Sequence, residues 1–159
     1  MFDLFKSAPF SDPQLGELVR SRGHWRGSIS LGADESVPLA VSGTRNEPDA
    51  QALQAAREVA TRFAGWRPTI EQALLEHYGP YAESLARGEL SEASAAFPRL
   101  ADASQVWGAV SLVAVTVSSL DGKASTELAY STLWDEEHTV GACFEGDEFI
   151  ELCGSVVPV

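Results

Sequence analysis

The sequence predicts an α+β protein, with a largely antiparallel sheet and a helical pair packed on one face of it. Apolar and polar residues alternate near the start, apolar residues recur at helical spacing in the middle, and alternation returns from Gln105. We expect the order β-β-β-α-α-β-β-β-β. At 159 residues and 45% hydrophobic, the chain can bury one core. We therefore expect an N-terminal segment at residues 1–14 and a single α+β domain at residues 15–159.

The first third of the domain contains three candidate strands. Residues 15–20 and 25–31 are two short strands joined by a turn, and the second alternates apolar and polar positions, which is typical of a sheet with one wet face. Residues 37–42 form the third. Because proline cannot donate a ladder hydrogen bond, we expect either that this strand lies at an edge of the sheet or that Pro38 is its first residue.

The middle of the chain predicts two helices. Asn46 is a plausible N-cap of the first helix, and Gly65 should end it. Thr69 and Gln72 form a capping box that opens the second helix, and Gly88 should stop it. The expected apolar stripes are Leu53, Ala56, Ala60 and Phe63 in the first helix, and Ile70, Leu74, Tyr78, Tyr81 and Leu85 in the second.

Four more strands are expected in the last third. From Gln105 to Val117 the period is two and both faces are apolar, which favours a central strand. Asp121-Gly122 is a hairpin turn signal. Residues 124–134, 140–144 and 148–154 supply the remaining strands, with the last two joined around Gly146-Asp147.

Charge is the most unusual property of the composition. Twenty-three acidic residues against 11 lysines and arginines give a net charge of −12. This balance argues against nucleic acid and against an anionic membrane as partners, since both require clustered basic residues. Residues 67–159 carry 15 of the acids and 4 of the bases, so the charge is concentrated there. The carboxylates either solubilise the surface or steer a basic protein partner.

The N-terminal residues and the lack of a long apolar stretch indicate the compartment. Residues 1–13 lack the apolar run of a secretion signal, and no stretch is long and apolar enough to span a membrane, so we expect a cytoplasmic protein.

Cys143 and Cys153 lie on opposite arms of the last hairpin, either on opposite faces or out of register. We therefore expect two small buried thiols that are too far apart to bridge.

The most distinctive motif is Trp134-Asp135-Glu136-Glu137-His138. Carboxylates beside an imidazole are the ingredients of acid/base or metal chemistry. In an extended chain, however, Asp135 and Glu137 point away from Glu136 and His138. We therefore assign no catalytic residue, metal ligand or cofactor, and expect a turn whose acids cap backbone N–H groups or pair with Arg20, Arg22 or Arg26.

Three segments also resemble a known group of proteins. LGELV and HWRGSISL near the start, together with LWDEEHTVGACFEGDEFIELCGSV at the end, resemble a family of uncharacterised bacterial domains. The resemblance covers residues 15–156 and departs from the family pattern at Thr139-Val140. It implies no catalytic residue. Some relatives lie near toxin-immunity genes, which implies an immunity-type role.

Three functions remain open. The first is a protein-binding module, with an immunity-type role as its specific form, whose acidic C-terminal surface docks on a basic protein partner. Its candidate binding residues are Trp134, Asp135, Glu136, Glu137, His138, Glu145, Asp147 and Glu148. The second is a hydrolase or metal-dependent enzyme that uses Asp135 to His138. The third is a structural or oligomeric domain, with an interface at Trp107, Trp134 and residues 156–159.

Overall fold

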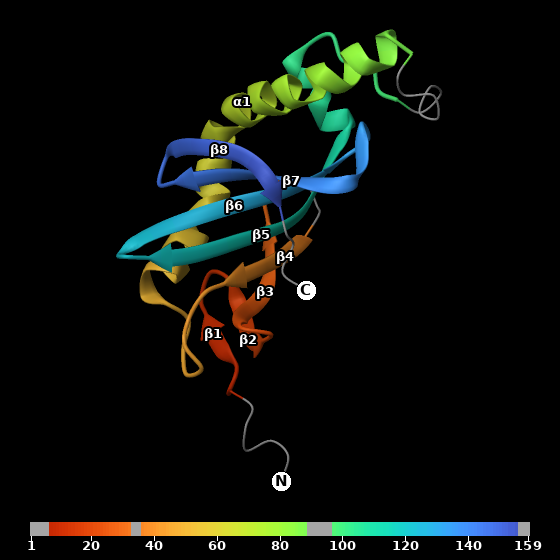
Figure 1. Ribbon diagram of the computed structural model, residues 1–159. Coiled ribbons are helices and arrows are strands. Elements are labelled where there is room, and N and C mark those ends of the chain that lie inside the picture. Colours follow the sequence, from red (N-terminus) through yellow and green to blue (C-terminus); the bar gives the residue numbers. More distant parts are fainter. Residues whose placement is uncertain (1–6, 33–35, 89–96, 156–159) are drawn as a thin grey trace.

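The fold is a single mixed sheet crossed on one face by a long helix (Figure 1). A computed structural model describes residues 7–32, 36–88 and 97–155; residues 156–159, expected at an interface, lie outside this part. The elements are β1 (Phe10–Asp12), β2 (Gly16–Ser21), β3 (His24–Ser30), β4 (Ser36–Val41), α1 (Ala50–Ala86), the 3-10 helix η2 (Ala103–Gly108), β5 (Val110–Leu120), β6 (Lys123–Thr132), β7 (Asp135–Glu145) and β8 (Glu148–Ser155).

The eight strands lie in the sheet in chain order, from β1 to β8. Six neighbouring pairs are antiparallel, which confirms the largely antiparallel sheet, and β4 and β5 are parallel. The parallel pair follows from connectivity, because the chain leaves β4, passes through α1 and returns to start β5 on the same side. The expected strand order was incomplete, since β1 lies in the N-terminal segment and brings the strands before the helix to four.

The expected helical pair is wrong, because residues 50–86 form one continuous helix. Gly65 does not end it, and Thr69 and Gln72 open no second helix. Pro68 and Pro80 lie inside it; each removes one backbone donor, and the helix axis changes direction along its length (Figure 1). One unbroken buried stripe runs past both prolines and outweighs these local costs. The stripe comprises Ala52, Leu53, Ala56, Val59, Phe63, Trp66, Ile70, Leu74 and Tyr78.

Both ends of α1 are defined by local chemistry. Asp49, not Asn46, is the N-cap, and its carboxylate accepts hydrogen bonds from the N–H groups of Gln51 and Ala52. The expected N-cap, Asn46, lies too early because the isolated bridge between Gly43 and Pro48 postpones the helix start. Gly88 lies just beyond the C-cap with φ of +74°, so its predicted role as the stop is confirmed.

Two strand predictions need correction. Pro38 neither confines β4 to an edge nor stands at its first position, because β4 lies between β3 and β5 and begins at Ser36. The pairing with β5 begins only at Leu39, one residue after the proline. The strand expected from Gln105 begins at Val110 instead. Asp102 and Gln105 form a capping box that turns Ala103–Gly108 into a 3-10 helix, a local interaction that the alternation of apolar residues concealed.

The core lies between α1 and one face of the sheet. Alternate residues of the strands, such as Trp25, Leu39, Val115, Leu128 and Phe144, pack against the helix stripe. The opposite positions form the second face of the sheet, which α1 does not cover. On that face the central strands place small side chains such as Ala40, Ala114 and Ala129. In the described part of the chain, no helix combines the length and hydrophobicity needed to cross a bilayer.

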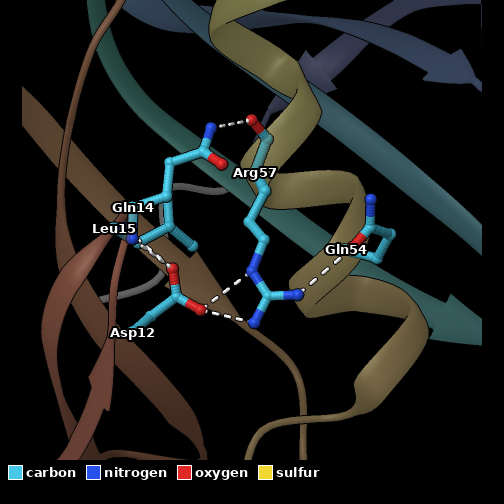
Figure 2. Close-up of polar contacts among 5 residues, drawn as sticks. All are labelled: Asp12, Gln14, Leu15, Gln54 and Arg57. Atoms are coloured by element: carbon cyan, nitrogen blue, oxygen red, sulfur yellow. Dashed lines mark hydrogen bonds and ion pairs between the residues drawn. The ribbon is translucent and has the colours of Figure 1, made fainter.

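A buried ion pair ties the first strand to the helix (Figure 2). Asp12, at the end of β1, is 2% exposed, and one carboxylate oxygen accepts hydrogen bonds from Arg57 Nε at 2.8 Å and from a second guanidinium nitrogen. The other oxygen accepts from the backbone N–H groups of Gln14 at 3.0 Å and Leu15 at 2.9 Å. The hydrogen bonds from Arg57 hold the pKa of Asp12 below its usual value, against the opposing effect of burial.

Replacing Arg57 by methionine should destabilise the protein by about 2–3 kcal/mol at pH 7, because a buried carboxylate would lose its partner. The pKa of Asp12 is lowered on folding, so this contribution is complete above the unfolded pKa near 3.8 and is lost as the pH falls through the folded value. Urea unfolding at pH 7 and at stepwise lower pH measures both effects. Arg99→Met, at an exposed arginine, is the control; an equal loss there would contradict the role of the ion pair.

Candidate functional site

The WDEEH segment lies at the connection between β6 and β7. The register passes from Ser131–Thr139 directly to Thr132–Asp135, so Glu136, Glu137 and His138 bulge out of the ladder. This bulge reverses one prediction, because Asp135 and His138 do not point apart. The Nδ1 atom of His138 lies 3.1 Å from each carboxylate oxygen of Asp135.

The same segment is bound to the C-terminal half of α1. Tyr81 donates its hydroxyl to Asp135 at 2.8 Å, and the indole N–H of Trp134 donates to Nδ1 of His77 at 3.0 Å. Burial alone would raise the pKa of Asp135, but the hydrogen bonds from Tyr81 and His138 outweigh it and lower the value. Burial lowers the pKa of His77, opposed by the charge of Asp135. These contacts make Asp135 a link between sheet and helix.

The segment divides into a buried part and an exposed part. Trp134 is 5% exposed and belongs to the core, where it also contacts the ring of Tyr78 edge to face. Glu136, Glu137 and the ring of His138 lie at the surface. Of the candidate binding residues in this segment, these three are therefore positioned to touch a partner.

The three arginines expected to pair with this segment lie far from it in the sheet. Arg20 is in β2, Arg22 is in the turn after β2 and Arg26 is in β3, several strands away from β7. Arg20 donates to the carbonyl oxygen of Gly43, and Arg26 donates to that of Ser21. Sequence alone could not reveal this separation, because it depends on the order of the strands.

The acids of the WDEEH segment form one acidic cluster, and Glu145, Asp147 and Glu148 form a second cluster at the other end of β7. Glu145 and Glu148 face each other directly across the β7–β8 turn, and Asp147 in that turn contacts Arg62 of α1 at 3.4 Å. The two clusters are separated by the length of β7, about 30 Å. The two acidic clusters therefore lie at opposite ends of β7.

Two further carboxylates join this cluster on the uncovered face of the sheet. Glu127 of β6 and Glu151 of β8 are the register partners of Cys143, on either side of it. Residues that face each other across neighbouring strands share one side of a sheet. We call the group Glu127, Glu145, Glu148 and Glu151 the acidic sheet face. Glu127 and Glu151 were missed because neither lies within a run of acidic residues, although the period-two alternation in their strands could have indicated them.

The prediction that Cys143 and Cys153 lie too far apart to bridge is wrong. Their sulfur atoms are 3.4 Å apart, both cysteines are free, and both are only half-buried. The register moves from Phe144–Phe149 to Cys143–Glu151, which leaves Ile150 as an extra residue in β8. This bulge brings both cysteines to one face as diagonal neighbours, and a hairpin drawn without it would separate them.

A cavity of about 320 Å³ lies between α1 and the sheet. Phe63, Trp107 and Tyr130 line it, and the guanidinium of Arg67 lies 4.4 Å from the centre of the Trp107 ring. The hydroxyl of Tyr130 is buried and has no hydrogen-bond partner among the described residues. Burial raises the pKa of Tyr130, partly opposed by the charge of Arg67, so the phenol stays neutral.

Comparison with known proteins identifies the family. Residues 14–156 match the family described as a domain of unknown function, DUF6985. The chain belongs to the DUF6985 family. The match covers nearly all of the described sheet and helix, in agreement with the resemblance to an uncharacterised domain family noted in the sequence. Searches of curated proteins and of solved structures gave no match to this DUF6985 chain.

In this DUF6985 domain, Tyr81→Phe should raise the pKa of Asp135, because the hydroxyl donates to its ionised carboxylate. At neutral pH the variant should be about 1.5 kcal/mol less stable. The folded pKa of Asp135 is lowered, so this difference should shrink as the pH falls through it. Carboxyl NMR titration and urea unfolding measure the two effects, and an unchanged pKa of Asp135 would contradict the link.

Tyr130→Phe should leave the DUF6985 domain equally stable or stabilise it by about 1 kcal/mol, because an unpaired buried hydroxyl is removed while the ring remains. Thermal unfolding of the two proteins makes the comparison. Tyr78→Phe is the control, since the hydroxyl of Tyr78 donates to Pro98 O at 2.7 Å and accepts from Leu100 N at 3.2 Å, and its loss should destabilise. A marked loss in Tyr130→Phe would show that the hydroxyl has a partner in solution.

Proposed function

We propose that this DUF6985 domain is a protein-binding module that docks the acidic sheet face on a basic partner protein. The observation that carries the proposal is the grouping of four carboxylates, those of Glu127, Glu145, Glu148 and Glu151, on the side of the sheet that α1 does not cover. Residues 110–155, which form β5 to β8, contain nine carboxylates in all; their one basic residue, Lys123, lies on the same side of β6 as Glu127. Glu145, Glu148 and Glu151 are exposed on the face that α1 leaves open.

The repulsion between Glu145 and Glu148 destabilises the end of the sheet unless a positive charge lies close to them. Like charges directly opposite each other on paired strands destabilise a sheet, and Glu145 and Glu148 are such a pair. A partner that places lysine or arginine against them would remove this repulsion. Such a surface also raises the rate of encounter with a positively charged protein, and this effect falls as salt screens the charges.

The negative charge of the acidic sheet face also indicates which class of protein would bind it. A protein that itself binds nucleic acid carries the clustered lysines and arginines that this face would complement. An immunity-type role, in which the domain occupies the nucleic-acid site of a toxin, is the specific form of the proposal. The surface residues Glu136, Glu137 and His138, at the far end of β7, would contact such a partner only at the rim of the interface.

The double variant Glu145→Gln/Glu148→Gln should bind a basic protein surface less tightly than the unmodified domain. A fluorescently labelled decapeptide of alternating lysine and alanine serves as the probe, with anisotropy measured across a series of NaCl concentrations. We expect a loss of affinity of about fivefold to tenfold at low salt, and a shallower dependence on salt, because two exposed charges are removed.

The matched control is Glu17→Gln/Glu47→Gln, which removes the same charge from exposed positions before α1. If net charge alone attracts the probe, both double variants will weaken binding equally, and the acidic sheet face has no special role. Binding that does not change with salt would also overturn the proposal.

A further inference from the structure

Three side chains from neighbouring strands converge above Gly141 on the uncovered face of the sheet. They are Glu127 of β6, Cys143 of β7 and Cys153 of β8, all of them half-buried. The two sulfur atoms are 3.4 Å apart, and all three potential ligand atoms lie within 4.8 Å of one another. No sequence motif marks this group, because the two cysteines do not form a C-x-x-C pair and Glu127 lies in a different strand.

The fold builds this cluster through register and through one glycine. Glu127 faces Cys143 across β6 and β7, while Cys153 faces Gly141 across β7 and β8. A Cβ atom on residue 141 would lie 2.6 Å from Oε1 of Glu127 and 2.8 Å from its Cγ. Gly141 therefore provides the space in which the Glu127 side chain extends across β7 toward the cysteines.

We infer that Glu127, Cys143 and Cys153 bind a thiophilic divalent cation, for which Zn²⁺ is the best match, with water in the fourth position. Thiolate sulfur and carboxylate oxygen are both ligands of tetrahedral Zn²⁺. Two sulfurs at about 2.3 Å from such an ion lie roughly 3.8 Å apart. The cysteines therefore need to separate by only a few tenths of an ångström. The inference concerns a different ligand from the proposed protein partner and does not depend on it.

Binding must displace protons from the cysteines. Burial, the neighbouring Cys153 and the charges of Glu127 and Glu151 raise the pKa of Cys143 to about 12, so the metal-free thiol is protonated at neutral pH. Each Zn²⁺ that binds both sulfurs forms two Zn–S bonds and releases two protons to solvent. The affinity should therefore rise with pH. The negative charges that disfavour the thiolates in the metal-free state favour the cation, because its charge reverses their effect.

Co²⁺ serves as a visible substitute for Zn²⁺ in the test. Titration of the fully reduced protein should give thiolate-to-cobalt charge-transfer absorption and strong tetrahedral visible bands, saturating at one ion per chain and bleached by added Zn²⁺. In weakly buffered solution, Zn²⁺ should release two protons per ion bound. Cys143→Ser and Cys153→Ser should each abolish the charge-transfer signal of a two-thiolate site.

The role of Glu127 is tested separately. Glu127→Gln should weaken Co²⁺ binding by about tenfold or more, and Gly141→Ala should do the same by displacing the Glu127 side chain while both cysteines remain. Glu17→Gln, at an exposed acid on β2, is the control and should bind Co²⁺ like the unmodified protein. Circular dichroism and urea unfolding of each variant show that the fold is kept.

Three results would overturn the inference. Absence of thiolate-to-cobalt absorption in the reduced protein excludes the site. Equal binding by Cys143→Ser and the unmodified protein places the metal elsewhere. Formation of a Cys143–Cys153 disulfide in air, seen as a loss of two mass units, together with no metal binding after reduction, assigns the pair to thiol–disulfide chemistry instead.

Discussion

Burial of the apolar stripe of α1 against one face of the sheet fixes the arrangement of the whole molecule. A single helix of 37 residues covers a sheet of eight strands, so the core has one layer of helix and one of sheet. The energy of this packing is large enough to carry the helix through Gly65, Pro68 and Pro80, where local preference would interrupt it. It also allows β4 and β5 to run parallel, since parallel neighbours need a long crossover connection and α1 is part of the one between them.

The second face of the sheet follows from the first. α1 does not cover it. In the central strands it carries small residues such as Ala40, Ala114 and Ala129, which are only 3–5% exposed. In β6 to β8 it also carries the four carboxylates of the acidic sheet face, the two cysteines and Lys123. Both proposals for this DUF6985 domain concern this face. One assigns its charge to a protein partner, and the other assigns the sulfur atoms and Glu127 to a metal ion.

Polar contacts hold the helix to the sheet near both of its ends. Toward the N-terminal end Arg57 pairs with Asp12 of β1, and toward the C-terminal end Tyr81 and His77 bind Asp135 and Trp134. The most distinctive motif in the sequence therefore has a structural role in its buried half, and only its exposed half is available to a partner. Buried polar residues that hold elements together are of the same types as catalytic residues, since both roles need a specific polar group at one position. A sequence motif of such residues therefore does not separate the two roles.

The sequence by itself determined the features that depend on neighbouring residues. These are the alternating strands, the turns at Asp121-Gly122 and Gly146-Asp147, the stop at Gly88 and the excess of acid in the C-terminal part. Only the tertiary structure decided that two predicted helices are one, because the stripe that unites them is stabilised by contacts with distant strands. The cluster of Glu127, Cys143 and Cys153 likewise depends on strand register and on one bulge in β8. A shift of one residue moves every side chain of a strand to the opposite face, and local sequence carries little information about such shifts.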